Sequence, residues 1–119
     1  MVLNHLNLTV TDVIATRRFL EKYFGLRPMT EGAKENPGFD ILRDDNGIVL
    51  TLIKVRNRTE LHYPDTFHIG FIQESEERVN EINQRLKDDG YEVDPPARLH
   101  GSWTFYFVCP GGFTIEVLG

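Results

Sequence analysis

Two histidines and one glutamate have residue types and positions suited to binding a metal ion. His5 and His68 each lie in a short stretch typical of a β-strand, and Glu116 lies in another such stretch near the end of the sequence. Two imidazoles and one carboxylate form a ligand set that leaves coordination positions open for substrate or water. Such an open set is typical of catalytic rather than structural metal sites. We therefore interpret His5, His68 and Glu116 as metal ligands.

Each of these side chains also has an ordinary interpretation. A histidine on a strand can be a core residue whose ring bonds a backbone carbonyl, and a glutamate close to the C-terminus is usually solvated. What favours a metal is that the two histidines occupy equivalent places in a repeated pattern. Histidine with one carboxylate suits Fe(II), Mn, Ni, Zn or Co, so the residue types do not distinguish among these divalent ions.

The elements that must position these residues occur twice along the chain. Side-chain periodicity, helix caps and turn residues predict one strand, one helix and three strands in the first half: 2–10, 13–24, 26–30, 39–43 and 48–55. The second half repeats this order: a strand at 67–73, a helix from Ser75 to Gly90, a strand starting at 91–93, and strands at 103–108 and 113–118. The predicted fold class is α+β, with two βαβββ modules in one chain.

The two halves correspond through a nearly constant shift in residue number. The shift is 63 from His5 to His68 and 65 from Gly25 to Gly90, so two residues of helix length account for the difference. Because so short a half cannot bury both faces of its sheet, the halves are expected to share one domain over 1–119. Module one is about 1–56, the linker about 57–65, and module two about 66–119. Thr51 matches Glu116, and threonine is a poor ligand, so we expect three protein ligands.

Length, charge and cysteine content exclude several classes of protein. The chain has 119 residues and a net charge of −5, the opposite of the basic surface that nucleic-acid binding needs. It has no apolar run near the roughly 20 residues that span a membrane. Cys109 is the one cysteine, and the N-terminus has no secretory pattern, so we expect a cytoplasmic protein.

Three segments resemble the vicinal oxygen chelate superfamily, which includes glyoxalase I, fosfomycin-modifying thiol transferases, extradiol dioxygenases and bleomycin-resistance proteins. They are Asn4-His5-Leu6, Phe67-His68-Ile69-Gly70-Phe71, and the stretch from Tyr106 to Glu116 with its Pro-Gly-Gly turn. The resemblance covers essentially the whole chain. It implies paired βαβββ modules whose mixed sheets curl around a cleft, with His5, His68 and Glu116 at the metal positions.

Departures from well-known members narrow the reaction. Glyoxalase I resembles a four-ligand enzyme with a glutamate on the strand that corresponds to 49–52, where this chain has Val-Leu-Thr-Leu. Fosfomycin-modifying enzymes have a similar triad and a tyrosine at the position of Tyr106. Extradiol dioxygenases place two histidines and one glutamate around Fe(II), in a longer chain. Bleomycin-resistance proteins bind their drug without the triad, so intact ligands favour an enzyme.

Further side chains in the second half are predicted to serve the same site. We assign Glu116 and Tyr106 catalytic roles, and Arg98, His100 and Trp103 substrate binding. A cationic side chain near the mouth of the second module could hold an anionic substrate group, and an aromatic ring could stack on a ligand. The ordinary alternatives are an exposed loop arginine and aromatic rings that belong to the core.

The sequence therefore predicts a glyoxalase- or dioxygenase-type metalloenzyme that acts on a small oxygen-rich substrate chelated to a divalent metal. Lyase, dioxygenase and thiol transferase reactions all remain open. The alternative is a non-catalytic protein of the bleomycin-resistance type that sequesters a small molecule. Relatives of this length resemble dimers, so we expect a homodimer with ligands shared between chains, and exposed sheet edges favour association independently. Because metal binding requires neutral imidazoles, activity should fall at acid pH.

Overall fold

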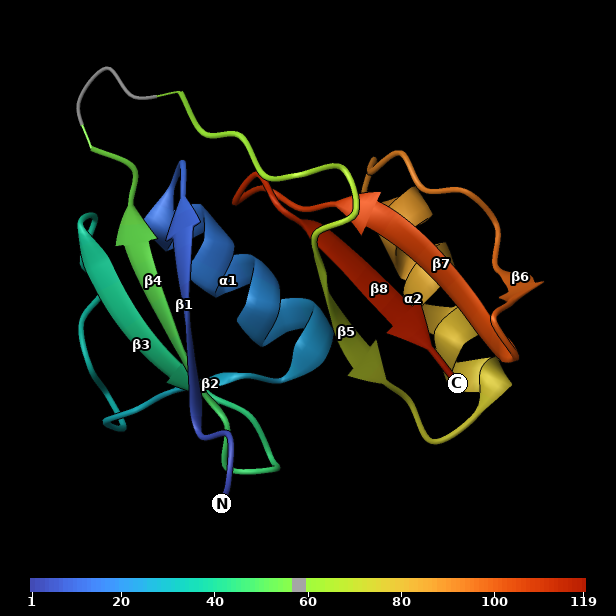
Figure 1. The fold of residues 1–119 in the computed structure, drawn as a ribbon, viewed down its shortest axis with the longest axis horizontal. Coiled ribbons are helices and arrows are strands. Elements are labelled where there is room, and N and C mark those ends of the chain that lie inside the picture. The colour runs from blue at the N-terminus through green and yellow to red at the C-terminus, as the bar shows by residue number, and fades with distance from the viewer. Residues whose placement is uncertain (57–59) are drawn as a thin grey trace. The chain divides into compact units, whose positions relative to one another are not determined.

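The structure is a computed structural model that describes residues 1–56 and 60–119. Its elements, drawn in Figure 1, are β1 (His5–Val10), α1 (Val13–Phe24), β2 (Arg27–Pro28), β3 (Phe39–Arg43), β4 (Val49–Lys54), β5 (His68–Ile72), α2 (Glu76–Asp88), β6 (Ala97–Leu99), β7 (Ser102–Val108) and β8 (Thr114–Leu118). Among the described residues, no helix combines the length and apolar character needed to cross a bilayer.

Each half of the chain forms an open four-stranded mixed sheet, and the strand order is the same in both. Sheet A has the order β1-β4-β3-β2, and sheet B has the order β5-β8-β7-β6. The first and last strands of each half pair in parallel, and the remaining pairs are antiparallel. The predicted α+β fold with two βαβββ modules is confirmed, and neither sheet closes into a barrel.

The register of the two sheets is equivalent residue by residue. Asn7 pairs with Thr51 between β1 and β4, and Gly70 pairs with Glu116 between β5 and β8. The first strands therefore differ by 63 in residue number and the last strands by 65, as the sequence predicts. Thr51 and Glu116 occupy the same place in their respective sheets, so β4 supplies no carboxylate where β8 does.

Local side-chain chemistry sets the ends of both helices. Asp12 caps α1 by accepting a hydrogen bond from the Ala15 amide at 3.0 Å, and α1 ends at Gly25, whose φ of 66° favours glycine. Ser75 caps α2 by accepting from the Arg78 amide at 3.1 Å. The helix predicted at 13–24 is confirmed, and the second helix begins directly after Ser75 as predicted.

One face of each sheet packs against the helix of its own module. Leu8 and Val10 of β1 are buried on this side, and so are Ile115 and Val117 of β8. Because successive strand residues point to opposite faces, His5, Asn7, His68, Gly70 and Glu116 lie on the faces turned away from the helices. The predicted metal ligands therefore all lie on these open faces.

The chain divides into two compact units: unit 1 is residues 1–63 with 110–112, and unit 2 is residues 64–109 with 113–119. The turn between β7 and β8 thus belongs to unit 1. There the Thr11 amide donates to the Gly111 carbonyl at 3.2 Å, and the Thr11 hydroxyl donates to the Pro110 carbonyl at 3.2 Å. The predicted linker, 57–65, includes residues 57–59, which lie outside the described residues.

The strand expected to start at 91–93 is wrong. The Tyr91 amide donates to the Leu86 carbonyl at 2.9 Å, which keeps this stretch at the end of α2. Pro95 and Pro96 follow, and neither has an amide hydrogen to donate to a neighbouring strand. Pairing therefore begins only after the prolines, where β6 lies antiparallel to β7.

Candidate metal and substrate site

His68, Tyr106 and Glu116 form a polar cluster on the open face of sheet B, within unit 2. The Glu116 Oε2 atom lies 3.3 Å from His68 Nε2. The Tyr106 hydroxyl donates to Glu116 Oε1 at 2.8 Å, and the rings of His68 and Tyr106 meet edge to face with their centroids 5.3 Å apart. The structure therefore brings together three of the residues that the sequence analysis assigned to the site.

A backbone carbonyl orients the His68 ring. Its Nδ1 atom lies 2.9 Å from the carbonyl oxygen of Thr66, and a carbonyl only accepts hydrogen bonds. Nδ1 therefore donates to this carbonyl, and Nε2 is the ring nitrogen that faces Glu116. Two electron-pair donors 3.3 Å apart are stable together when a proton or a cation lies between them. This donor pair fits a divalent metal ion, because neutral imidazole and carboxylate are common ligands and such histidines usually donate their other N–H to an oxygen.

Two hydroxyl groups hold the other oxygen of Glu116. Oε1 is in contact with the Tyr106 hydroxyl at 2.8 Å and with the Thr104 hydroxyl at 3.0 Å. The Glu116 side chain is only 14% exposed, so its orientation is largely set by these neighbours. Thr104 was not among the predicted site residues. Its parity on the strand places it on the same face as Tyr106, but its contact with Glu116 also depends on the register of β7 and β8.

Tyr106 keeps its proton at neutral pH. Burial raises the pKa of Tyr106 above its ordinary value, and the hydrogen bond to Glu116 and the charge of that carboxylate raise it further. The phenol is therefore a hydrogen-bond donor to Oε1, and it is also a group that can hold a proton beside a bound substrate.

Gly70 leaves space beside the His68–Glu116 pair. It lies directly opposite Glu116 in the register of β5 and β8. A Cβ atom at Gly70 would lie 3.7 Å from Glu116 Oε2 and 3.5 Å from the Leu118 side chain. The missing side chain therefore leaves an approach to Oε2 that a larger residue would fill.

His5 lies in unit 1, on the open face of sheet A. Its Nδ1 atom is 2.7 Å from the Asn4 side-chain oxygen, which only accepts, so Nδ1 is the donor in this contact. His5 is thus oriented through Nδ1 as His68 is, by a different neighbour. Within the described residues, no group of three or more His, Cys, Asp or Glu side chains is gathered closely enough to hold a metal. The complete set of three ligands stays a prediction.

Two of the predicted substrate-binding residues contact α2. Arg98 donates to Glu76 at 2.8 Å and stacks over the Trp103 ring at 5.5 Å, and the Trp103 indole donates to Asn80 at 2.8 Å. These contacts lie on the helix-facing side of sheet B, whereas Tyr106 lies on the other side. The assignment of Arg98 and Trp103 to substrate binding therefore stays a prediction that these contacts do not support.

His100 occupies the turn between β6 and β7. It has a φ of 51° and is followed by Gly101 with a φ of 81°, which is typical of a tight two-residue hairpin. The exposed imidazole is held by the turn geometry rather than by the cluster around Glu116. Its assignment to substrate binding also stays a prediction.

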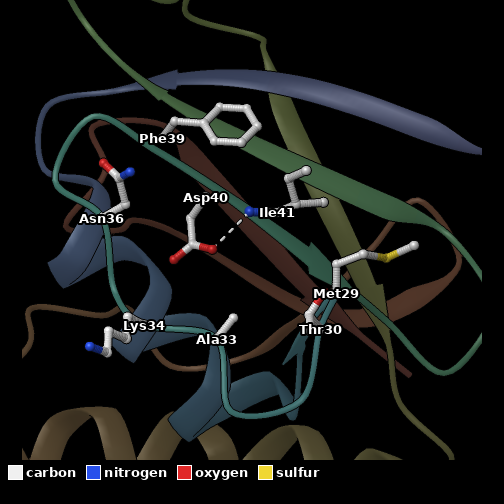
Figure 2. A pocket seen from close by; sticks show the side chains of 8 residues that line it. All are labelled: Met29, Thr30, Ala33, Lys34, Asn36, Phe39, Asp40 and Ile41. Atoms are coloured by element: carbon white, nitrogen blue, oxygen red, sulfur yellow. Dashed lines mark hydrogen bonds between the residues drawn. The ribbon is translucent and has the colours of Figure 1, made fainter.

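Unit 1 contains a pocket of about 220 Å³ beside β3, shown in Figure 2. Asp40 lies in its wall, where its carboxylate accepts from the Ile41 amide at 2.9 Å and from the Arg17 guanidinium at 2.9 Å. Phe39 and Met29 contribute apolar surface and are 43% and 50% exposed. The lining residues are Met29, Thr30, Ala33, Lys34, Asn36, Phe39, Asp40 and Ile41. Apolar and polar side chains therefore share the lining, and the Asp40 carboxylate is paired with Arg17.

Paired βαβββ modules, with a histidine and a glutamate on the open face of one sheet, define a protein of the vicinal oxygen chelate type. The model of the Glyoxalase/Bleomycin resistance protein/Dioxygenase superfamily matches residues 2–117. The chain belongs to this superfamily. The resemblance inferred from the sequence segments is thereby confirmed. No curated protein matches the chain.

Solved structures show the same relationship. The chain is similar to a possible glyoxalase from Bacillus cereus, with 54% identity over 100% of this chain and 99% of that chain and a TM-score of 0.88. It is similar to the fosfomycin resistance protein FosX from Listeria monocytogenes, with 25% identity over 99% and 92% of the two chains and a TM-score of 0.73. A lactoylglutathione lyase from Agrobacterium tumefaciens, 20% identical over 98% and 92% with a TM-score of 0.74, shares the fold.

Proposed function

We propose that this protein is a metal-dependent enzyme that holds a divalent ion through His5, His68 and Glu116 and acts on a small oxygen-rich substrate. The observation that carries the proposal is the 3.3 Å approach of His68 Nε2 to Glu116 Oε2, with the Nδ1 proton of His68 committed to a backbone carbonyl. Neighbouring oxygen atoms orient each proposed ligand, as is common around metal-binding histidines and carboxylates.

Each residue of the cluster has a separate task in this proposal. Thr66 orients His68, the hydroxyls on Oε1 orient Glu116, and Asn4 orients His5. A bound divalent ion would polarise substrate oxygens and stabilise negative charge that develops on them. Tyr106, which retains its proton, holds a proton where a substrate oxygen could receive it.

The position of Thr51 bears on the class of reaction. It occupies the place in β4 that Glu116 occupies in β8, so this strand offers no carboxylate that could serve as a fourth ligand or as a base. The absence of this carboxylate argues against the four-ligand glyoxalase I reaction. It favours a reaction in which a metal-chelated substrate is attacked or oxidised. Similarity to a fosfomycin resistance protein makes fosfomycin the first substrate to assay, with thiol conjugates and catechols after it.

Metal binding by ligand variants tests the proposal. Protein purified without added metal is analysed for bound metal, and then titrated with Mn²⁺, Co²⁺, Ni²⁺ and Zn²⁺. His5→Ala and His68→Ala should each weaken metal binding by about 100-fold or more. Loss of a residue that only hydrogen-bonds to a metal ligand typically weakens binding by about 10- to 100-fold. His62→Ala is the matched control, because His62 is 76% exposed and pairs with Glu60. If His5→Ala and His68→Ala leave bound metal and every activity unchanged, the proposal fails.

A second candidate function is sequestration of a small molecule without catalysis. The observation that favours it is the pocket beside β3, whose lining combines apolar side chains with polar groups that could orient a ligand. Ligand binding is then measured on chelator-treated protein. Binding that survives metal removal, together with no turnover in any assay, would favour sequestration over catalysis.

Assembly and location belong to the same proposal. Ile72 and Val108 lie on the open side of sheet B with 80% and 67% of their surface exposed, which supports association with a second copy. We propose a homodimer in which metal ligands are shared between chains, to be checked by light scattering. A cytoplasmic location, inferred from the single cysteine, is proposed on the same footing.

A further inference from the structure

We propose that Thr104 is a positioning residue that determines which oxygen of Glu116 is presented to His68. The inference rests on the proposed metal-binding function of Glu116 and extends it to a residue that binds no metal itself. Thr104 is 1% exposed, and its hydroxyl oxygen lies 3.0 Å from Glu116 Oε1 and 3.0 Å from the Val117 carbonyl oxygen. A buried hydroxyl on β7 thus contacts both the Glu116 side chain and the backbone of β8, the strand that carries Glu116.

The Thr104 hydroxyl has one proton and two neighbouring acceptors. An ionised carboxylate is the stronger acceptor of the two, so the proton is expected to point to Glu116. Because the group is buried, water cannot take its place if the hydroxyl is removed. Oε1 would then keep only the Tyr106 hydroxyl as a donor.

Tyr106 alone does not fix the carboxylate as firmly. Its hydroxyl restrains Oε1 through a single hydrogen bond. Thr104 is short and β-branched, so its χ1 angle has few alternatives, and the contact with the Val117 carbonyl limits them further. With Oε1 fixed by Thr104, Oε2 remains the oxygen that faces His68. Glu116 should therefore bind an ion through one oxygen.

Substitution of the hydroxyl separates this role from a purely structural one. Thr104→Val keeps the shape and removes the hydroxyl, and Thr104→Ser keeps the hydroxyl. The control is Thr16→Val, because Thr16 is also fully buried and donates to a backbone carbonyl, that of Asp12 at 2.6 Å, within unit 1. Thr104→Val should weaken Mn²⁺ or Zn²⁺ binding by about 10- to 100-fold, as is typical for residues that orient metal ligands.

Thr104→Ser and Thr16→Val decide whether Thr104 positions Glu116 or only stabilises the fold. Thr104→Ser should bind the ion within about threefold of the wild type, and Thr16→Val should bind it like the wild type even if its folded state is equally destabilised. Wild-type affinity in Thr104→Val would overturn the inference. So would a Thr104→Ser protein that binds as weakly as Thr104→Val.

Crystal structures of the metal-free wild type and Thr104→Val test the positioning without any metal. In the wild type, Oε1 should contact both hydroxyls and Oε2 should face His68. In Thr104→Val the carboxylate should turn so that this arrangement is lost. An unchanged carboxylate in Thr104→Val would overturn the inference even if the proposed function is correct. A wild-type protein that binds no ion would instead overturn the proposed function, while the two crystal structures would still decide what Thr104 does.

Discussion

Gly70 and Glu116 lie directly opposite each other on the parallel strands β5 and β8, and the glycine leaves the space next to Glu116 Oε2 open. A strand interior usually disfavours glycine, because it adds no side chain to the packing and is flexible when unfolded. Gly70 is suited to this position because it has no side chain to cover Glu116 Oε2. The surface beside Oε2 and His68 Nε2 is where an ion and the substrate bound to it would need to approach.

Filling that space should block the site without unfolding the sheet. Gly70→Ala places its Cβ at ordinary contact distances of 3.7 Å and 3.5 Å, so metal affinity should stay within about threefold of the wild type. Gly70→Val adds two methyl groups beside Oε2 and should weaken the affinity about tenfold or more. Calorimetric titration gives the affinities, and circular dichroism verifies the fold. Equal metal affinity in Gly70→Val and the wild type would show that this space is not the approach.

Metal should stabilise the folded protein through His68. A divalent ion at about 100 times its Kd is expected to increase the free energy of unfolding by about 2.7 kcal/mol, and a chelator should reverse the gain. Denaturant titration with and without the ion measures it. In His68→Ala the gain should largely disappear, whereas His62→Ala should retain it. A gain of the same size in His68→Ala would place the ion elsewhere.

Tyr106 predicts a fall in stability at alkaline pH. Its pKa in the folded protein is raised above the ordinary value of 10.0, first by burial and then by Glu116. Above about pH 10 the unfolded chain therefore loses the phenol proton while the folded chain still holds it, and the free energy of unfolding falls as pH rises through this range. Urea titrations of metal-free protein between about pH 9 and pH 11 should show a smaller fall for Tyr106→Phe. Identical profiles for Tyr106→Phe and the wild type would contradict the prediction.

The buried ion pair in unit 1 should matter for stability rather than for metal binding. Arg17 donates to Asp40 at 2.9 Å, and their side chains are 8% and 9% exposed. Arg17→Met leaves the buried Asp40 carboxylate without its cation and should lower the free energy of unfolding by about 3–5 kcal/mol. Arg18→Met breaks an exposed pair with Glu35 and should change stability far less. Urea unfolding measures the free energy of unfolding of both variants. An equal loss in Arg17→Met and Arg18→Met would contradict the prediction that the buried pair matters more than the exposed one.

Much of the fold could be predicted because its signals are local. A cap at Asp12 and a left-handed glycine at Gly25 define α1 within a few neighbouring residues. The repeat could be predicted because equivalent glycines and histidines recur at nearly constant spacing. The strand misplaced at 91–93 shows the limit of such signals. There, a hydrogen bond back to α2 and two prolines delay the pairing until β6.

Strand alternation predicts which side chains of one strand share a face, but it does not predict which residues of two strands lie opposite each other. Tyr106 and Glu116 lie in contact, as expected for residues of two strongly patterned strands joined by a short turn, and their catalytic roles stay a prediction. The contact between Thr104 and Glu116 is diagonal across two strands, so it depends on a register that a single sequence does not fix. Trp103 has the opposite parity to Tyr106, which places it on the face toward α2.

The assignment of residues 110–112 to unit 1 has a consequence for any attempt to divide the protein. A piece that ends at Tyr63 would lack the carbonyl groups that Thr11 binds, and a piece that begins at Pro64 would carry that loop without its host. Both hydrogen bonds of Thr11 would be lost from either piece, so a division of the chain between Tyr63 and Pro64 would cut through unit 1 rather than between the two units.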